Sequence, residues 1–252
     1  MNYNWYWKVL LEPEPGGTGT YLHYLVVGLG WTLATALAAW VIALAVGGAV
    51  GTLRTTPMKW AVRLGNFYVE IFRNIPLIVQ MFLWFFVVPE LLPKGLGDWI
   101  KQVPPPWGSY IPAVLCLGIF TSVRVAEQVK AGIQSLPRGQ RFAGTANGLT
   151  EAQTYRYVIL PQAFRIILPP LTSEFMNIVK NSSVALTIGL LELTGRARAM
   201  QEFSFRVFEA FTAATVIYLL TNLIVVLGMR ALEKKVRVPG LIAAGGAPMA
   251  GH

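Results

Sequence analysis

Apolar residues along this chain are gathered into long blocks that contain no Asp, Glu, Lys or Arg. Four such blocks cover residues 15–53, 74–89, 102–123 and 210–229. Each block is about as long as a membrane-spanning helix needs, or slightly shorter. Buried helices of soluble proteins rarely run without charge at this length. The pattern therefore predicts an all-α integral membrane protein that crosses the membrane several times.

Five membrane-spanning helices are expected from these blocks and the residues around them. The second contains residues 75–92 and begins earlier, near Met58, because Pro57 suits the first turn of a helix. The segment 93–106, rich in Pro and Gly, is expected to be an external loop. The fourth helix carries Pro169-Pro170 at its start, and a bend or break is expected there or at residues 181–183. The other expected helices cover residues 22–53, 111–129, 166–191 and 211–228.

Basic residues are unevenly shared between the two sides that five passes define. The side with fewer basic residues would receive Lys8, Lys94, Lys101, Arg196, Arg198 and Arg206. The other side would receive Arg54, Lys59, Arg63, Lys130, Arg138, Arg141, Arg156, Arg165, Arg230, Lys234, Lys235 and Arg237. Because the richer side is usually cytoplasmic, the N-terminus is expected outside and the C-terminus inside. Residues 1–21 would then form an external segment, and residues 241–252 a disordered cytoplasmic tail.

Composition supports this picture and narrows the chemistry. The chain is 54% hydrophobic and 13% charged, whereas soluble domains carry about 25% charged residues. The net charge of +9 fits a basic cytoplasmic side beside anionic lipid, and nucleic acid is not expected as a partner. With one Cys and two His, no disulfide, metal site or cofactor is expected. The sequence also has no G-x-x-x-x-G-K-[ST] phosphate loop, so ATP would have to be hydrolysed by a partner.

The segment between the third and fourth passes, about residues 130–165, is patterned like a folded piece. Residues 141–146 favour a short helix, and Asn147-Gly148 supplies a residue able to take the left-handed conformation that ends it. Thr150 and Gln153 have the spacing of a capping box, in which each side chain bonds to the backbone N–H of the other. The sequence therefore predicts a helix, a glycine turn and a second helix.

The same segment resembles the EAA loop of importer-type ABC permeases. Its pattern of two small residues, a Gly and a Leu-Pro is matched in register by Ala143-Gly144, Gly148 and Leu160-Pro161, whereas Phe142 stands at the acidic position. Flanking stretches resemble permeases for polar amino acids, namely residues 127–140, 72–80 and Leu168-Pro169-Pro170. Residues 233–240 and Lys180-Asn181-Ser182 resemble the glutamate/aspartate branch.

This resemblance implies a multi-subunit importer in a bacterial inner membrane. The chain would be one of two permease subunits, the other being the same or a homologous chain. Two ATPase subunits would bind on the cytoplasmic side, and a periplasmic protein would deliver the amino acid. The transmembrane domain would cover residues 22–240. The loop would contact an ATPase through Arg138, Phe142, Ala143, Gly144, Gly148, Leu149 and Thr150.

Two cations within the predicted spans, Arg124 and Lys180, require an explanation. Inserting an isolated cation into the membrane within a helix costs about 2.5 kcal/mol or more of free energy. The ordinary explanation for Arg124 is an ion pair with Glu127, three residues on. For Lys180 it is an extension toward the membrane surface or a pair with Glu174. The alternative is that these cations line the translocation path and attract a carboxylate. Neutral hydrogen bonds could then come from Asn181, Ser182 and Ser183.

These observations predict a transmembrane subunit that forms the path of an ABC amino-acid importer, for glutamate and aspartate. The chain itself is not expected to be an enzyme, because its spans hold no nucleophile–base set or metal ligands. An importer of another polar amino acid, such as glutamine or asparagine or a broad range, stays open. A channel or secondary transporter is the other alternative, although such transporters commonly contain internal repeats and none is evident here.

Overall fold

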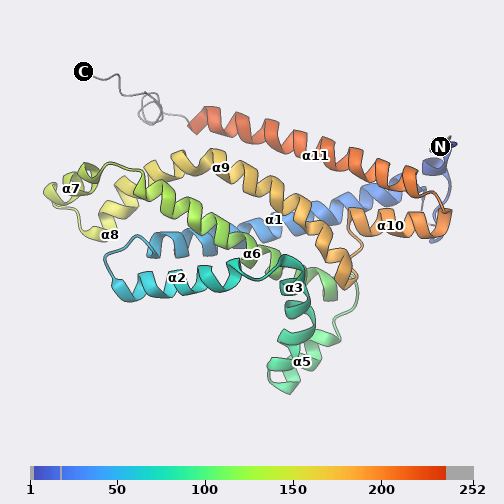
Figure 1. Cartoon of the computed structure of the whole chain (residues 1–252), viewed down its shortest axis with the longest axis horizontal. Helices are drawn as coiled ribbons and strands as arrows, with labels where there is room; N and C mark the ends of the chain where they lie inside the picture. The colour runs from blue at the N-terminus through green and yellow to red at the C-terminus, as the bar shows by residue number, and fades with distance from the viewer. Residues whose placement is uncertain (1–2, 18, 237–252) are drawn as a thin grey trace.

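The long helices of the molecule run back and forth along its longest axis (Figure 1). A computed structural model describes residues 3–17 and 19–236. Within these ranges the chain forms helices and no strand, apart from one isolated bridge between Pro13 and Thr20. The prediction of an all-α protein is confirmed.

Four long helices make the framework: α1 (Tyr21–Leu53), α6 (Trp107–Gln134), α9 (Leu160–Asn181) and α11 (Val207–Val236). Between α1 and α6 lie α2 (Lys59–Arg73), α3 (Leu77–Phe82), the π-helix η2 (Leu83–Val87), α4 (Val88–Leu91) and α5 (Lys94–Lys101). The remaining elements are η1 (Trp7–Leu11), α7 (Arg138–Ala146), α8 (Glu151–Thr154), the π-helix η3 (Tyr155–Ile159), the 3-10 helix η4 (Ser182–Ile188) and α10 (Leu193–Ser204).

Within the described residues, α1, α6 and α11 are long and apolar enough to cross a membrane. The pair formed by α2 and residues 77–91 meets the same criteria as one bent crossing. Helix α9 is not among them, and its Arg165, Glu174 and Lys180 lower its hydropathy. In Figure 1 α9 nevertheless runs beside α6 along the longest axis of the molecule, whereas α2 covers only part of that length before the chain turns off into α3.

The second predicted pass is not one helix, and this expectation is corrected. Helix α2 ends at Arg73, and the chain bends by 99° before residues 77–91. Pro76 has no N–H to donate and disfavours helical geometry at Ile75, so the helix stops here. The Nε2 atom of Gln80 donates to the carbonyls of Phe72 and Ile75, at 2.9 and 3.0 Å. A single buried amide thus satisfies carbonyls that the break leaves free.

The fourth predicted pass is interrupted at one of the two expected places. Helix α9 continues through Pro169 and Pro170, so no break occurs there. The α-helix ends at Asn181 and gives way to η4, which Gly189 closes with a φ of 85°. Two α-helices were not predicted from the sequence. Helix α5 lies inside the expected external loop, and α10 follows η4. The expected tail at 241–252 lies outside the described residues.

Helix α10 is held in place by the buried carboxylate of Glu192, which caps its N-terminus. Its Oε1 accepts from the backbone N–H of Gly195 at 2.8 Å, and its Oε2 accepts from Thr194 N–H at 3.0 Å. The hydroxyls of Thr32 in α1 and Tyr218 in α11 also donate to Oε2, at 3.3 and 2.8 Å. One carboxylate therefore ties three helices together.

Helices α1 and α6 approach closely because the contacting face of α1 carries small residues. A Cβ atom added at Gly47 would lie 2.6 Å from the backbone oxygen of Ser122, and one at Gly51 would lie 2.7 Å from that of Ala126. Both distances are shorter than real contacts allow. Two glycines four residues apart are a common way for spanning helices to bring their backbones together.

Replacing Gly51 with Ala should therefore destabilise the protein by about 1–3 kcal/mol, because the helices must separate. Gly48→Ala is the matched control, since an added Cβ meets nothing within 4 Å. The thermal unfolding midpoint of each variant in detergent measures the effect. Equal midpoints for the two variants would show that the close approach is unimportant.

Candidate functional site

The loop between α6 and α9 folds as the sequence predicts. Helix α7 ends at Ala146, and Gly148 follows with a φ of 78°, in the left-handed region. The Thr150 hydroxyl accepts from Gln153 N–H at 3.3 Å, and the Gln153 side chain accepts from Thr150 N–H at 2.9 Å. The capping box at the start of α8 is thus confirmed.

Helices α7 and α8 pack closely on each other. A Cβ added at Gly144 would lie 2.6 Å from Cγ2 of the buried Thr154, so this position requires a glycine unless the helices move. Arg141 in α7 forms an ion pair with Glu151 in α8. The Gly144 carbonyl also accepts from Leu149 N–H at 3.1 Å. The loop is therefore a rigid unit rather than a flexible linker.

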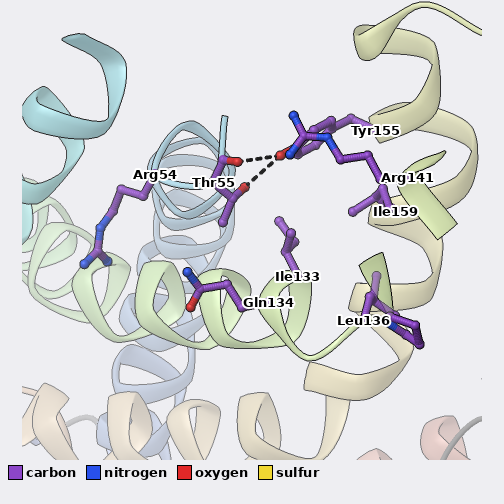
Figure 2. Close-up of a pocket in the computed structure, with 9 residues that line it drawn as sticks. Arg54, Thr55, Ile133, Gln134, Leu136, Arg141, Tyr155 and Ile159 are labelled. Atoms are coloured by element: carbon purple, nitrogen blue, oxygen red, sulfur yellow. Dashed lines mark hydrogen bonds between the residues drawn. The ribbon is translucent and has the colours of Figure 1, made fainter. Parts of the chain in front are cut away.

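This unit is joined to the segment that follows α1 by the hydroxyl of Tyr155. The Tyr155 hydroxyl donates to the backbone carbonyl of Thr55 at 2.6 Å, as Figure 2 shows. The two residues lie beside a cleft of about 440 Å³ between the ends of α1 and α6 and the loop. Arg141 lies over the Tyr155 ring, 5.6 Å from its centroid. Any movement of the loop would thus act on the residues that follow α1.

The residues proposed from sequence for ATPase contact lie on this unit. Phe142 is 70% exposed, so its ring is accessible to a partner. Ala143, Gly148 and Thr150 are exposed, Leu149 is half-buried and Gly144 is buried. Arg138 is the first residue of α7. Gly144 therefore acts within the unit, whereas Phe142 is at its surface.

Glu127 does not pair with Arg124, and this expectation is wrong. Its Oε1 lies 3.1 Å from Nη2 of Arg54, whose side chain is only 6% exposed. The Nε of Arg54 also donates to Asn66 Oδ1 in α2, at 2.8 Å. A buried guanidinium needs a counter-charge more than an exposed one does. The spacing of three residues favoured Glu127 as the partner of Arg124. In the fold, however, Glu127 pairs with Arg54, which is distant in the sequence.

Arg124 instead faces Glu174 across the gap between α6 and α9. Its Nη1 lies 3.6 Å from Glu174 Oε2, and the two side chains are 45% and 12% exposed. This distance is too long for a hydrogen bond, and within the described residues Oε2 is buried without a hydrogen-bond partner. The Arg124 guanidinium also lies 5.2 Å from the centroid of the Phe120 ring. The pair is therefore loose and retains unused hydrogen-bonding capacity.

Arg124 and Glu174 line a polar cavity of about 450 Å³ between α2, α6 and α9. Its wall also contains Phe72, Arg73, Phe120, Val123, Glu127 and Gln128. Arg73 and Gln128 were not predicted from the sequence as lining residues. Gln128 lies four residues after Arg124, and this spacing on a helix could have identified it. Arg73 reaches the cavity because α2 ends there, and the broken second pass was not foreseen.

The other path candidates lie at the end of α9, and none of them lines this cavity. Lys180 is exposed and Asn181 is half-buried. Ser182 is buried and donates to the Val179 carbonyl at 2.8 Å, and Ser183 donates to that of Lys180 at the same distance. Both hydroxyl groups therefore already donate a hydrogen bond to a backbone carbonyl of α9. Among the described residues, no group of three or more His, Cys, Asp or Glu could hold a metal ion.

Comparison with known proteins gives a consistent result. Residues 43–238 match the family "Binding-protein-dependent transport system inner membrane component". The chain is 48% identical to the glutamate/aspartate import permease protein GltJ of Escherichia coli (strain K12), over 95% of this chain and 98% of that protein. It is 35% identical to the probable glutamine ABC transporter permease protein GlnM of Bacillus subtilis (strain 168), over 79% and 88%.

A solved structure shares the fold as well as the sequence. It is described as "Crystal structure of an amino acid ABC transporter with histidines", and its chain is 30% identical with a TM-score of 0.71, over 85% of this chain and 95% of that one. The chain therefore belongs to the family of binding-protein-dependent transport system inner membrane components, as a permease subunit of an ABC importer of amino acids whose ATPase is a separate subunit.

Proposed function

We propose that this permease carries glutamate and aspartate, and that the polar cavity between α2, α6 and α9 holds the solute in transit. The observation that carries the proposal is the loose pair of Arg124 and Glu174, which leaves both groups able to bind a ligand. The relative named as a glutamate/aspartate permease supports the choice of solute.

The charges around the cavity complement an acidic amino acid. Arg73 and Arg124 are positive and Glu174 is negative, while Glu127 is neutralised by Arg54. The balance is therefore one positive charge, and an acidic amino acid carries one net negative charge. Its two carboxylates would meet the two guanidinium groups, which offer planar paired donors. Its ammonium group would meet the unpartnered oxygen of Glu174.

Glutamine is the second candidate solute, because a relative 35% identical is named as a probable glutamine permease. Glutamine has one carboxylate, so it would use only one of the two arginines. The relative uptake of the two solutes therefore distinguishes the candidates. Lys180, Asn181, Ser182 and Ser183 would contribute only outside this cavity, at the break between α9 and η4.

For coupling, we propose that the exposed face of α7 around Phe142 fits one of two ATPase subunits. A second permease subunit, the same or a homologous chain, would complete the path, and a periplasmic protein would deliver the solute. Within the chain, force would pass from α7 and α8 through Tyr155 to the end of α1. The rigid packing at Gly144 supports this assignment, because a flexible loop would absorb the motion.

For orientation, we propose that residues 130–165 are cytoplasmic and that the N-terminus is outside. In Figure 1, α7 and α8 lie at the end of the molecule opposite η1. The excess of basic residues on the α7 side supports a cytoplasmic location.

The orientation can be checked with Thr145→Cys in a Cys116→Ser background, since Thr145 is exposed. A membrane-impermeant thiol reagent should label this cysteine only after the cells are permeabilised. Labelling in intact cells would reverse the proposed topology. Lys94→Cys, in the segment expected outside, is the matched control. Its cysteine should be labelled without permeabilisation.

Gly148→Val tests the coupling loop. An added side chain has room here, but a β-branched residue resists the left-handed conformation that Gly148 adopts. We expect normal membrane insertion, loss of transport and weaker ATPase association, measured by uptake and by co-purification. Gly148→Asn is the control, because Asn tolerates this conformation, and it should retain most activity. Normal uptake by the Val variant would contradict the assignment.

Arg124→Gln tests the solute site. We expect uptake of glutamate and aspartate to fall about tenfold or more at low concentration, as expected when a charged hydrogen-bond donor is lost. Glutamine uptake, where present, should change less. Arg124→Lys keeps the charge without the planar donors and should give an intermediate result. Because Glu174 would lose its counter-charge, Arg124→Gln with Glu174→Gln is needed as a second variant. Unchanged acidic uptake in both, at equal protein level, would make Arg124 structural.

A further inference from the structure

A groove with a basic rim and apolar walls lies between α9 and α11, near the end of α11. It encloses about 280 Å³, and its charged rim contains Arg165, Arg230 and Lys234. Its apolar walls come from Leu168, Pro169 and Val236. The groove is separate from the solute cavity and from the cleft beside Tyr155, since no lining residue is shared.

The one acidic residue in the groove does not cancel this charge. Glu233 is half-buried, and its Oε1 accepts from the Thr172 hydroxyl of α9 at 2.9 Å. The carboxylate is therefore committed to the contact between the two helices. Three cations and one anion leave a surplus of two positive charges, so the groove favours an anion.

The position of the groove along α11 indicates which anion it can receive. Helix α11 is a candidate span, and only 17% of its apolar window is buried. A run of exposed apolar residues precedes Arg230, namely Val216, Leu219, Leu220, Leu223, Ile224 and Leu227, and Leu232 is exposed beyond it. Arg230 and Lys234 follow Leu227 by three and seven residues, or about 5 and 10 Å along the helix axis. The headgroup layer begins where the hydrocarbon ends and is roughly 5–8 Å deep. Arg230 therefore lies at headgroup depth, and the long side chain of Lys234 can reach the headgroups from just beyond it.

We propose that this groove binds an anionic phospholipid, with the phosphate at Arg165, Arg230 and Lys234 and an acyl chain along the exposed apolar residues of α11. Basic pockets between spanning helices are suited to such lipids. A soluble phosphate compound would match the charges but would leave the apolar walls and the adjacent apolar face unused.

Protein occupants fit the groove less well. A second permease subunit related by a two-fold axis along the membrane normal would bring an equivalent basic end to the same level. The chain's own residues 237–252 contain no Asp or Glu, so no side chain there could supply an anion. Charge complementarity therefore favours lipid over these alternatives.

The test measures binding of phosphatidylglycerol to the assembled transporter by native mass spectrometry, with phosphatidylcholine as the neutral comparison. Arg165→Gln with Arg230→Gln should weaken phosphatidylglycerol binding about 25-fold, at about fivefold for each basic side chain near an anionic headgroup. Arg156→Gln with Lys235→Gln removes two exposed cations that do not line the groove, and it should change binding less than twofold. Arg165→Lys with Arg230→Lys should retain binding, which separates loss of charge from misfolding.

Four results would overturn the proposal. Equal loss in both glutamine pairs would indicate diffuse attraction rather than a site, and no loss in either would show that the groove is not used. Displacement of the lipid by glycerol phosphate at similar concentrations would identify a soluble anion as the occupant. A photoreactive residue at position 230 should attach to lipid, and attachment to an ATPase or a second permease would replace lipid with that subunit. None of these readouts depends on which amino acid is transported.

Discussion

The close approach of α1 to α6 is the constraint on which the rest of the molecule depends. Gly47 and Gly51 let the two backbones meet, and the end of α1 thereby places Arg54 beside Glu127. Since Arg54 is almost fully buried, it binds this carboxylate and removes it from Arg124. Arg124 is then left with Glu174 across the gap to α9, at a distance that leaves both groups only partly satisfied. The polar cavity follows from that arrangement.

The same end of α1 also connects the cavity to the loop that precedes α9. Thr55 accepts the Tyr155 hydrogen bond, and Arg54, its neighbour, binds Glu127. Glu127 lies three residues from Arg124, about one turn along α6. A continuous set of contacts therefore joins the surface of α7 to the charged wall of the cavity. We infer that ATPase movement reaches the solute along these contacts, a hypothesis that Tyr155→Phe would test by lowering uptake per ATP hydrolysed. Unchanged coupling in that variant would refute it.

Features that depend on neighbouring residues were predicted correctly from the sequence. Features that depend on contacts between distant segments were not. The glycine turn at Gly148 and the capping box at Thr150 depend on neighbouring residues only, and both are confirmed. The pairing of Arg124 was mistaken because its competitor, Arg54, is 70 positions away in the sequence. Helix α10 was missed because its cap, Glu192, is stabilised by Thr32 and Tyr218 from other helices. The break before Pro76 could have been predicted from this proline, but the apolar residues 74–89 were assigned to one continuous helix.

Access of the solute to the polar cavity is the central claim, and cysteine protection tests it most directly. Gln128 lines the cavity, so Gln128→Cys in a Cys116→Ser background places a thiol beside Arg124. In the assembled transporter with its periplasmic binding protein, a small water-soluble reagent should label this thiol. Glutamate or aspartate should slow the labelling, and lysine should not. An unchanged rate at saturating glutamate, in a variant that still transports glutamate, would contradict the account.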